Sequence, residues 1–334
     1  MNALDSDRRS RHVPKWDPGI LRWRLFKGAR RLRQRFCGAC YRDEDSDTRN
    51  SILVAGTGRS GTTWLAGIIA SQLRCRMMFE PFYPAKVEAY RSFHYFQYMR
   101  PDERNDRLYA FCETILSGSI RNAWIDSQIE YLRPRCRIVK EIRANLFLRW
   151  IHDRFPEIPI LFVIRHPCAV VQSRMSLNWA TDGDIRPFVL QDKLVKDFLS
   201  DKMDIIERAT TPEEKHAIVW CVSNLVPLRQ FEGHALNVVF YEDLCLRPDE
   251  EIRKIFKMIG HSATDGAIRH ALRPSATVTR GSSIVSGESN ITAWSTRMTA
   301  AQRDVVLRTV EAFGLHHLYG SSSVPQVPRH TMNQ

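Results

Sequence analysis

Two turns far apart in the sequence carry residue types suited to binding phosphate. The first lies within SILVAGTGRSGTTWL, residues 51–65, and the second within ILFVIRHPCAVVQSR, residues 160–174. Each segment begins as a short apolar run typical of a buried strand and then turns into the start of a helix. Helix N-termini offer unpaired N–H groups and positive potential to an anion. Two such turns in this order predict a nucleotide with phosphate groups at both ends.

The first turn combines glycines with hydrogen-bond donors. Glycines at positions 56, 58 and 61 remove the Cβ atom where the chain must turn sharply. A strand, turn and helix without a ligand would also explain the pattern. The interpretation that we favour is a cradle for one phosphate, formed by Arg59, Ser60, Gly61, Thr62 and Thr63.

The second turn places an arginine at the end of an apolar run. Arg165 follows residues 160–164, and Pro167 suits the first position of a helix. Ser173 comes one to two helical turns later, so it can face the same ligand as Arg165. Guanidinium groups bind phosphate through paired hydrogen bonds. The alternative is a surface arginine that caps the helix.

Two better-known phosphate loops compete with this interpretation. GTGRSG matches the dinucleotide pattern GxGxxG, and Glu80 follows at about the expected distance of 20 residues. The P-loop pattern GxxxxGK[ST] fails, because Thr62 stands where its lysine belongs. Neither pattern explains the second turn. A nicotinamide-dependent or kinase-like enzyme stays an alternative, as does a non-catalytic basic protein that binds membrane or nucleic acid.

Strand-like and helix-like runs alternate along the chain. This alternation predicts a single α/β domain over residues 49–320, with a mainly parallel sheet flanked by helices. Ligands of such sheets bind beyond the carboxyl ends of the strands, so Arg59, Glu80, Lys140 and Arg165 are expected in one crevice. The expected strands are 51–55, 75–79, 136–140, 160–164 and 236–241, and the expected helices are 62–73, 102–119, 144–154, 168–178, 213–231, 248–259 and 299–313.

The composition favours an anionic partner. The 334 residues carry a net charge of +12, which suits a phosphorylated nucleotide, an acidic glycan, a membrane surface or nucleic acid. No apolar run reaches the roughly 18 to 20 residues of a spanning helix, so we expect a cytoplasmic protein. The eight cysteines are scattered, and Cys37 and Cys40 form a lone CxxC. We therefore expect free thiols and no bound metal.

Residues 1–48 differ from the rest and are expected to form an N-terminal extension. Residues 20–36 contain seven Lys or Arg and no acid, with Leu21, Leu25, Leu32 and Phe36 at helical spacing. Such a basic amphipathic helix can lie on an anionic membrane, grip an acidic substrate or pack on the main domain. Residues 321–334 are Ser/Pro-rich and are expected to be a loose tail.

Together the two turns resemble motifs of the sulfotransferases that use 3′-phosphoadenosine-5′-phosphosulfate. GRSGTTWL looks like the family's 5′-phosphosulfate loop, and RHPCAVVQS looks like its 3′-phosphate motif. The likeness runs from about residue 50 to about residue 318 and includes FEPF (79–82), VKEIR (139–143), WCVSNL (220–225) and FYEDLCLRP (240–248). It implies the P-loop-like sulfotransferase fold and no metal. The layout looks closer to the carbohydrate enzymes than to those acting on phenols and steroids.

The resemblance assigns roles in donor binding. It implies that Trp64 stacks on the adenine and that Arg165 and Ser173 hold the 3′-phosphate. Tyr241 matches a family tyrosine near the base, although it also suits a strand-end core position. Arg280 occupies the place of a loop that closes over the 3′-phosphate.

The resemblance also implies in-line sulfuryl transfer to an acceptor hydroxyl, on a carbohydrate or carbohydrate-like molecule. Nucleic acid is not expected as a partner. Glu80 stands where the carbohydrate enzymes place a catalytic glutamate, and a partly dry cleft would raise its pKa. Lys140 would stabilise the bridging oxygen. Two alternatives remain open: Glu141 as the base, and Glu80 as a structural ion-pair partner of Lys140 or Arg143.

Overall fold

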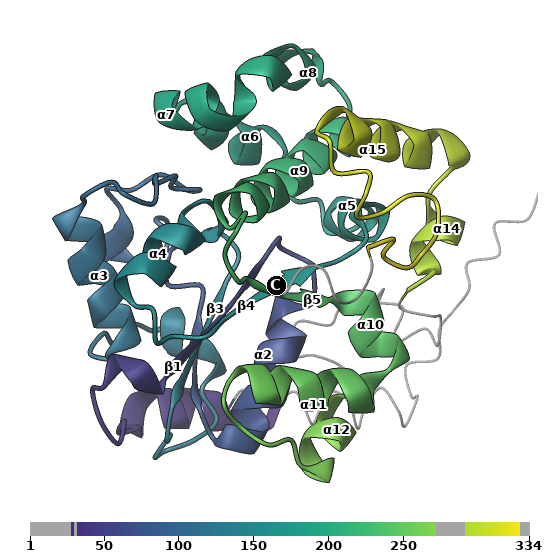
Figure 1. Ribbon diagram of the computed structural model, residues 1–334. Helices are drawn as coiled ribbons and strands as arrows, with labels where there is room; N and C mark the ends of the chain where they lie inside the picture. The colour runs from purple at the N-terminus through teal and green to yellow at the C-terminus, as the bar shows by residue number, and fades with distance from the viewer. Residues whose placement is uncertain (1–27, 30–31, 272–290, 328–334) are drawn as a thin grey trace, which may run out of the picture.

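Five parallel strands form the central sheet (Figure 1) of the computed structural model, which describes residues 28–29, 32–271 and 291–327. Their order across the sheet is β2-β3-β1-β4-β5. All five overlap the predicted strands, so the predicted α/β fold with a parallel sheet flanked by helices is confirmed. The strands are β1 (Ser51–Gly56), β2 (Arg76–Phe79), β3 (Arg137–Glu141), β4 (Ile160–Ile164) and β5 (Asn237–Phe240).

The apolar runs identify the strands because the sheet is covered on both faces. Leu53 and Ala55 of β1 belong to the core on one face, whereas Ile52 and Val54 belong to the core on the other. Successive side chains of a strand point to opposite faces, so a doubly covered strand reads as an uninterrupted apolar run.

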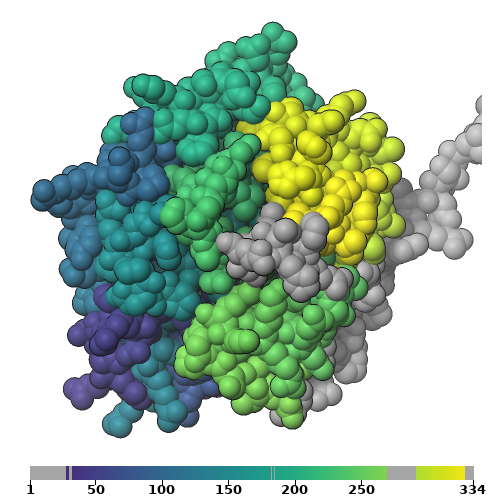
Figure 2. Space-filling model, viewed as in Figure 1, coloured from purple at the N-terminus to yellow at the C-terminus, as the bar shows by residue number. Residues whose placement is uncertain are grey.

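Helices cover both faces of the sheet. One core contains residues of α2 (Thr62–Leu73), α11 (Pro248–Met258) and α12 (Asp265–Ala271). The other contains residues of α3 (Asp106–Leu116), α4 (Leu148–Arg154) and α9 (Pro212–Gln230). Helix α15 contacts α9, and in Figure 2 the yellow C-terminal segment lies against the green segment near the centre of the view. Further α-helices of the described residues are α5 (Pro167–Met175), α6 (Asp182–Val189), α7 (Asp192–Leu194), α8 (Met203–Arg208), α10 (Tyr241–Leu246), α14 (Ala293–Arg297) and α15 (Ala300–Ala312).

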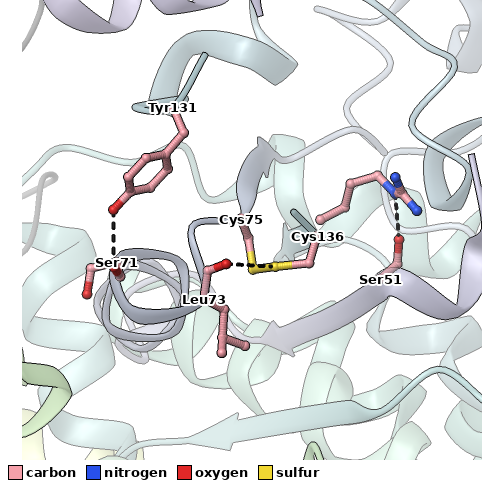
Figure 3. The surroundings of a disulfide bond; sticks show 7 residues. Ser51, Ser71, Leu73, Cys75, Tyr131 and Cys136 are labelled. Carbon is pink, nitrogen blue, oxygen red and sulfur yellow. Dashed lines mark hydrogen bonds between the residues drawn. A yellow bond between two sulfur atoms is a disulfide. The ribbon is translucent and has the colours of Figure 1, made fainter. Parts of the chain in front are cut away.

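A disulfide joins the starts of two neighbouring strands (Figure 3). Cys75 precedes β2 and Cys136 precedes β3, and the two sulfur atoms are bonded. The expectation of free thiols was therefore wrong for this pair. The parallel register pairs Arg76 with Arg137, so the preceding cysteines become neighbours with Cα atoms 4.4 Å apart. Because β2 is an edge strand, the bond fixes it to the sheet.

Reduction of this disulfide should lower the free energy of unfolding by about 2–4 kcal/mol, because a cross-link restricts the unfolded chain. Guanidinium denaturation with and without reductant measures the change. The double variant Cys75→Ser/Cys136→Ser is the control, since reductant should not affect it. Equal stability of the wild type in both buffers would mean that the two thiols are free in solution.

Part of the predicted N-terminal extension packs on the domain. Tyr41 donates a hydrogen bond to Asp126 at 3.3 Å. The buried Arg76 forms an ion pair with Asp43 at 2.8 Å, and Arg137 donates to the Asp45 carbonyl at 2.9 Å. Residues 1–27 and 30–31, which include most of the predicted basic helix, lie outside the described residues. Within the described part of the chain, no helix is long and apolar enough to cross a membrane.

Candidate functional site

The loop between β1 and α2 is shaped by close packing around its glycines. Gly61 forms the N-cap of α2 with a φ of 97°. A Cβ atom at this position would lie 2.5 Å from the ring of Tyr241. At Gly58, a Cβ atom would lie 2.7 Å from the ring of Trp179. The two rings therefore pack directly on the loop backbone, and only glycine allows this approach.

The structure brings the two predicted turns together. Arg59 in the first turn donates from Nε to Ser173 Oγ at 3.0 Å. Arg165 in the second turn donates from Nη1 to the Arg59 carbonyl oxygen at 3.1 Å. Arg59 adopts a φ of 81°, a left-handed conformation that is uncommon for residues other than glycine. Backbone strain of this kind concentrates at functional sites. In this conformation the Arg59 guanidinium reaches Ser173 of α5.

Positive charge accumulates at this junction. Burial lowers the pKa of Arg59, and the neighbouring Arg165 and Arg174 lower it further. Arg174 was not among the predicted site residues, although it directly follows Ser173. It is buried and donates to His216 Nδ1 at 3.0 Å. Burial, with Arg174 beside it, lowers the pKa of His216 to about 4, so this ring is neutral near pH 7. A site that assembles cations in this way is suited to an anion.

The other predicted donor-binding residues lie around the same loop. Tyr241 packs between the guanidinium of Arg165, 4.2 Å away, and the ring of Trp64, 5.4 Å away. Burial raises the pKa of Tyr241, so its hydroxyl stays protonated at neutral pH. Thr62 and Thr63 form the first turn of α2. Ser60 is fully buried, and its hydroxyl has no hydrogen-bond partner among the described residues. Arg280 lies outside the described residues.

An unsatisfied buried hydroxyl beside two arginines fits a phosphate-bearing ligand. Buried polar groups normally have partners, and a phosphate oxygen would accept from Ser60. The described residues contain no group of three or more His, Cys, Asp or Glu placed to hold a metal ion.

A second cluster forms where β2 and β3 end. The Glu80 carboxylate accepts from Lys140 Nζ at 2.5 Å and from Arg143 Nη1 at 2.7 Å. Glu80 is 6% exposed. Burial alone would raise its pKa, but Lys140 and Arg143 together hold the pKa below its usual range. The expected raised pKa of Glu80 was therefore wrong, because the sequence did not reveal that both oxygens are held by cations. The ion-pair alternative describes the observed geometry.

Glu141, the alternative base, is closed off from solvent in this structure. It is 0% exposed. Its carboxylate accepts from the backbone N–H groups of Phe82, Ile142 and Arg143 at 2.8–2.9 Å. Burial raises its pKa despite these hydrogen bonds. Glu141 instead ties the segment after β2 to the segment after β3, which positions Glu80 and Arg143.

Replacing Gly61 with alanine should destabilise the loop and weaken nucleotide binding, because a Cβ atom there meets Tyr241 and the backbone has a positive φ. Gly67→Ala in the same helix is the control, since nothing lies within 4 Å of its added Cβ. The control should gain about 0.5–1 kcal/mol of stability. Thermal unfolding with and without nucleotide checks both variants. Equal behaviour of the two would refute the close packing of Tyr241 on the loop.

Comparison with known proteins assigns the chain to a family. The sequence pattern of the sulfotransferase family matches residues 51–265, and the chain belongs to that family. It is similar to nodulation protein NoeE of Sinorhizobium fredii (strain NBRC 101917 / NGR234), with 26% identity over 216 residues. The match covers 62% of this chain and 49% of NoeE, so the chain spans about half the length of that relative.

Solved sulfotransferase domains resemble the chain more loosely. The domain from the curacin biosynthetic pathway gives a TM-score of 0.45 at 14% identity and covers 79% of this chain and 96% of its own. The domain from the Synechococcus PCC 7002 olefin synthase gives 0.41 at 15% identity, with 81% and 96% covered.

Proposed function

We propose that the chain transfers the sulfuryl group of 3′-phosphoadenosine-5′-phosphosulfate to a hydroxyl of a carbohydrate acceptor. The observation that carries the proposal is the contact between the two turns, in which Arg59 binds Ser173 and Arg165 binds Arg59. Membership of the sulfotransferase family supports sulfuryl transfer in general. The identity of the donor and the chemical class of the acceptor are our proposal.

Different residues around the loop would bind different parts of the donor. The 5′ end of the nucleotide would contact Arg59, Ser60 and the start of α2, including Thr62 and Thr63. Its 3′-phosphate would contact Arg165 and Ser173. Trp64 would stack on the adenine, as the family resemblance implies, and Arg280 would join the 3′ end. When bound, the donor supplies the SO₃ group, and this chain binds and orients it.

Glu80 would accept the proton of the acceptor hydroxyl, and Lys140 would stabilise the charge that develops on the bridging oxygen. Because its pKa is lowered, Glu80 is ionised at neutral pH and can accept a proton. The same two cations make it a weak base. Full activity therefore requires that Lys140 engage the donor and leave one carboxylate oxygen available.

A nicotinamide enzyme is disfavoured by the same geometry. In the dinucleotide fold the acidic residue after the glycine loop binds ribose hydroxyls. Both oxygens of Glu80 are instead held by Lys140 and Arg143.

A carbohydrate acceptor is supported by the aromatic side chains near Glu80. Tyr83, Tyr95 and Trp124 are each partly exposed, and Trp124 donates from Nε1 to the Glu80 carbonyl oxygen at 3.2 Å. Rings of this kind stack on the apolar face of a sugar. The neighbouring Phe82 is buried in the core and is not available for this role. Transfer of ³⁵S from labelled donor to glycans, with phenols as the comparison, tests the proposal. Label found in phenols alone would overturn it.

We also propose that the protein binds peripherally to a membrane. Leu32 and Phe36 are 72% and 59% exposed, and the exposed Arg33 and Arg35 lie beside them. Apolar and basic side chains together suit an anionic membrane surface. Sedimentation of the full chain with anionic vesicles tests this, with Leu32→Ser/Phe36→Ser as the comparison. Equal sedimentation of both proteins would refute this surface as the contact.

A further inference from the structure

Arg143 packs against two aromatic rings, which meet edge to face beside the Glu80 carboxylate. Its guanidinium carbon lies 3.9 Å from the ring centroid of Tyr83 and 4.6 Å from that of Tyr95. Its Nη1 donates to Glu80 Oε2 at 2.7 Å. The residue is 5% exposed. Planar guanidinium groups stack on aromatic faces, and a buried cation over a ring gains more than an exposed one.

The backbone of Arg143 is fixed as well. Its N–H donates to Glu141 Oε1 at 2.9 Å, and Glu141 also binds the N–H of Phe82 at 2.9 Å. Two rings therefore hold the guanidinium, and the buried Glu141 holds the peptide. The backbone of Glu80 is fixed too, since its N–H donates to the Lys140 carbonyl at 2.8 Å.

Lys140 binds the same carboxylate in a different way. Its ammonium contacts Glu80 Oε1 at 2.5 Å and lies 4.7 Å from the Phe79 ring centroid. Lysine has a flexible stem and no planar group to stack. Of the two carboxylate oxygens, Oε2 therefore has the rigidly held partner, and Oε1 has the partner that can move.

We propose that Arg143 is the positioning residue for Glu80, clamped by Tyr83 and Tyr95, and that it reserves Glu80 Oε1 for proton transfer. The inference rests on the proposed function, in which the acceptor oxygen forms a bond to sulfur as its proton passes to Glu80. The sulfur–oxygen bond to the 5′-phosphate breaks in the same step, and the bisphosphate nucleotide leaves. Arg143 touches no reacting atom and acts only through Glu80.

The charge around Glu80 supports this role. Lys140 and Arg143 oppose the rise that burial would cause in the pKa of Glu80. Arg143 interacts electrostatically with two carboxylates, those of Glu80 and Glu141. Removing the guanidinium would leave Glu80 with a single cation and with Glu141 as an uncompensated neighbour.

Titration of the Glu80 carboxyl by ¹³C NMR tests the proposal without an acceptor, and Glu80→Gln assigns the signal. In Arg143→Gln the acid dissociation constant of Glu80 should fall roughly tenfold or more, because an opposite charge at hydrogen-bond distance has been removed. Arg143→Lys keeps the charge but not the stacking, so it should give a smaller change, and it serves if the glutamine variant fails to fold. Arg91→Gln is the matched control, because Arg91 makes an equally short ion pair with Glu88 on the surface.

Turnover and donor binding then separate positioning from folding. Arg143→Gln should move the acid limb of the kcat profile to higher pH while the Kd of 3′-phosphoadenosine-5′-phosphate stays within about twofold. An unchanged Glu80 titration in both Arg143 variants would overturn the proposal. If the wild type fails to bind the bisphosphate, the proposed function fails, yet the titration still decides whether Arg143 controls Glu80.

Discussion

Replacing Arg59 with alanine should abolish turnover and weaken the binding of 3′-phosphoadenosine-5′-phosphate by about 2–5 kcal/mol, which is roughly 30-fold to several thousandfold. The Arg59 side chain contacts the second turn from within the first, through Ser173. In the proposed site, its removal eliminates a charge-assisted contact to phosphate, and burial strengthens such contacts. Isothermal titration calorimetry measures the loss.

Two further variants make the Arg59 result specific. Arg208→Ala removes an exposed arginine and should leave nucleotide affinity unchanged. Arg59→Gly should lose nucleotide affinity as the alanine variant does. It should unfold at a higher denaturant concentration than the alanine variant, because glycine adopts the φ of 81° without the cost of roughly 1–2 kcal/mol that other residues incur. Near wild-type affinity of both Arg59 variants would contradict the loop assignment.

Replacing Glu80 with glutamine should lower kcat by roughly 10²-fold or more while nucleotide affinity is kept. The amide keeps the shape of the side chain but cannot accept the acceptor's proton. It also leaves the charges of Lys140 and Arg143 without their carboxylate, so the free energy of unfolding should fall by about 3–5 kcal/mol. Steady-state kinetics and denaturant titration report the two effects separately.

The pH dependence of stability gives the Glu80 variant a second signature. The pKa of Glu80 is lower in the folded protein than in the unfolded chain. Its contribution is therefore complete above the unfolded pKa of about 4.3 and is lost as pH falls through the folded pKa. Glu80→Gln should lack this acid loss. An unchanged kcat would mean that another residue is the base. An unchanged dependence of stability on pH would mean that Glu80 is not ion-paired in solution.

The sequence predicted the sheet and the meeting of the two turns because both depend on local patterns. Uninterrupted apolar runs identified β1 and β4, since a doubly covered strand has no polar face. Arg59 and Arg165 each follow such a strand, and the carboxyl ends of parallel strands share one edge. The proximity of Arg59 to Ser173 therefore followed from the fold class and from the helical spacing after Arg165.

Other features depend on register and on burial, which the sequence does not encode locally. The Cys75–Cys136 disulfide arises from the pairing of β2 with β3, and their separation in sequence gave no signal. The lowered pKa of Glu80 depends on two cations that reach it from the end of β3 and the turn beyond. Glu141 was the alternative to Glu80 as the base, and the sequence did not show that it is fully buried. The packing of Arg143 against Tyr83 and Tyr95 depends on the fold of the loop that carries the two tyrosines, which no local pattern predicts.

The most direct test of the account is calorimetric titration of the wild type with 3′-phosphoadenosine-5′-phosphate, alongside NAD and ATP. The two-turn site predicts tight binding of the bisphosphate and weak or undetectable binding of the other two, because its cations match phosphates at both ends of one nucleoside. Preferential binding of NAD or ATP, or no binding of any of the three, would contradict the assignment of both turns.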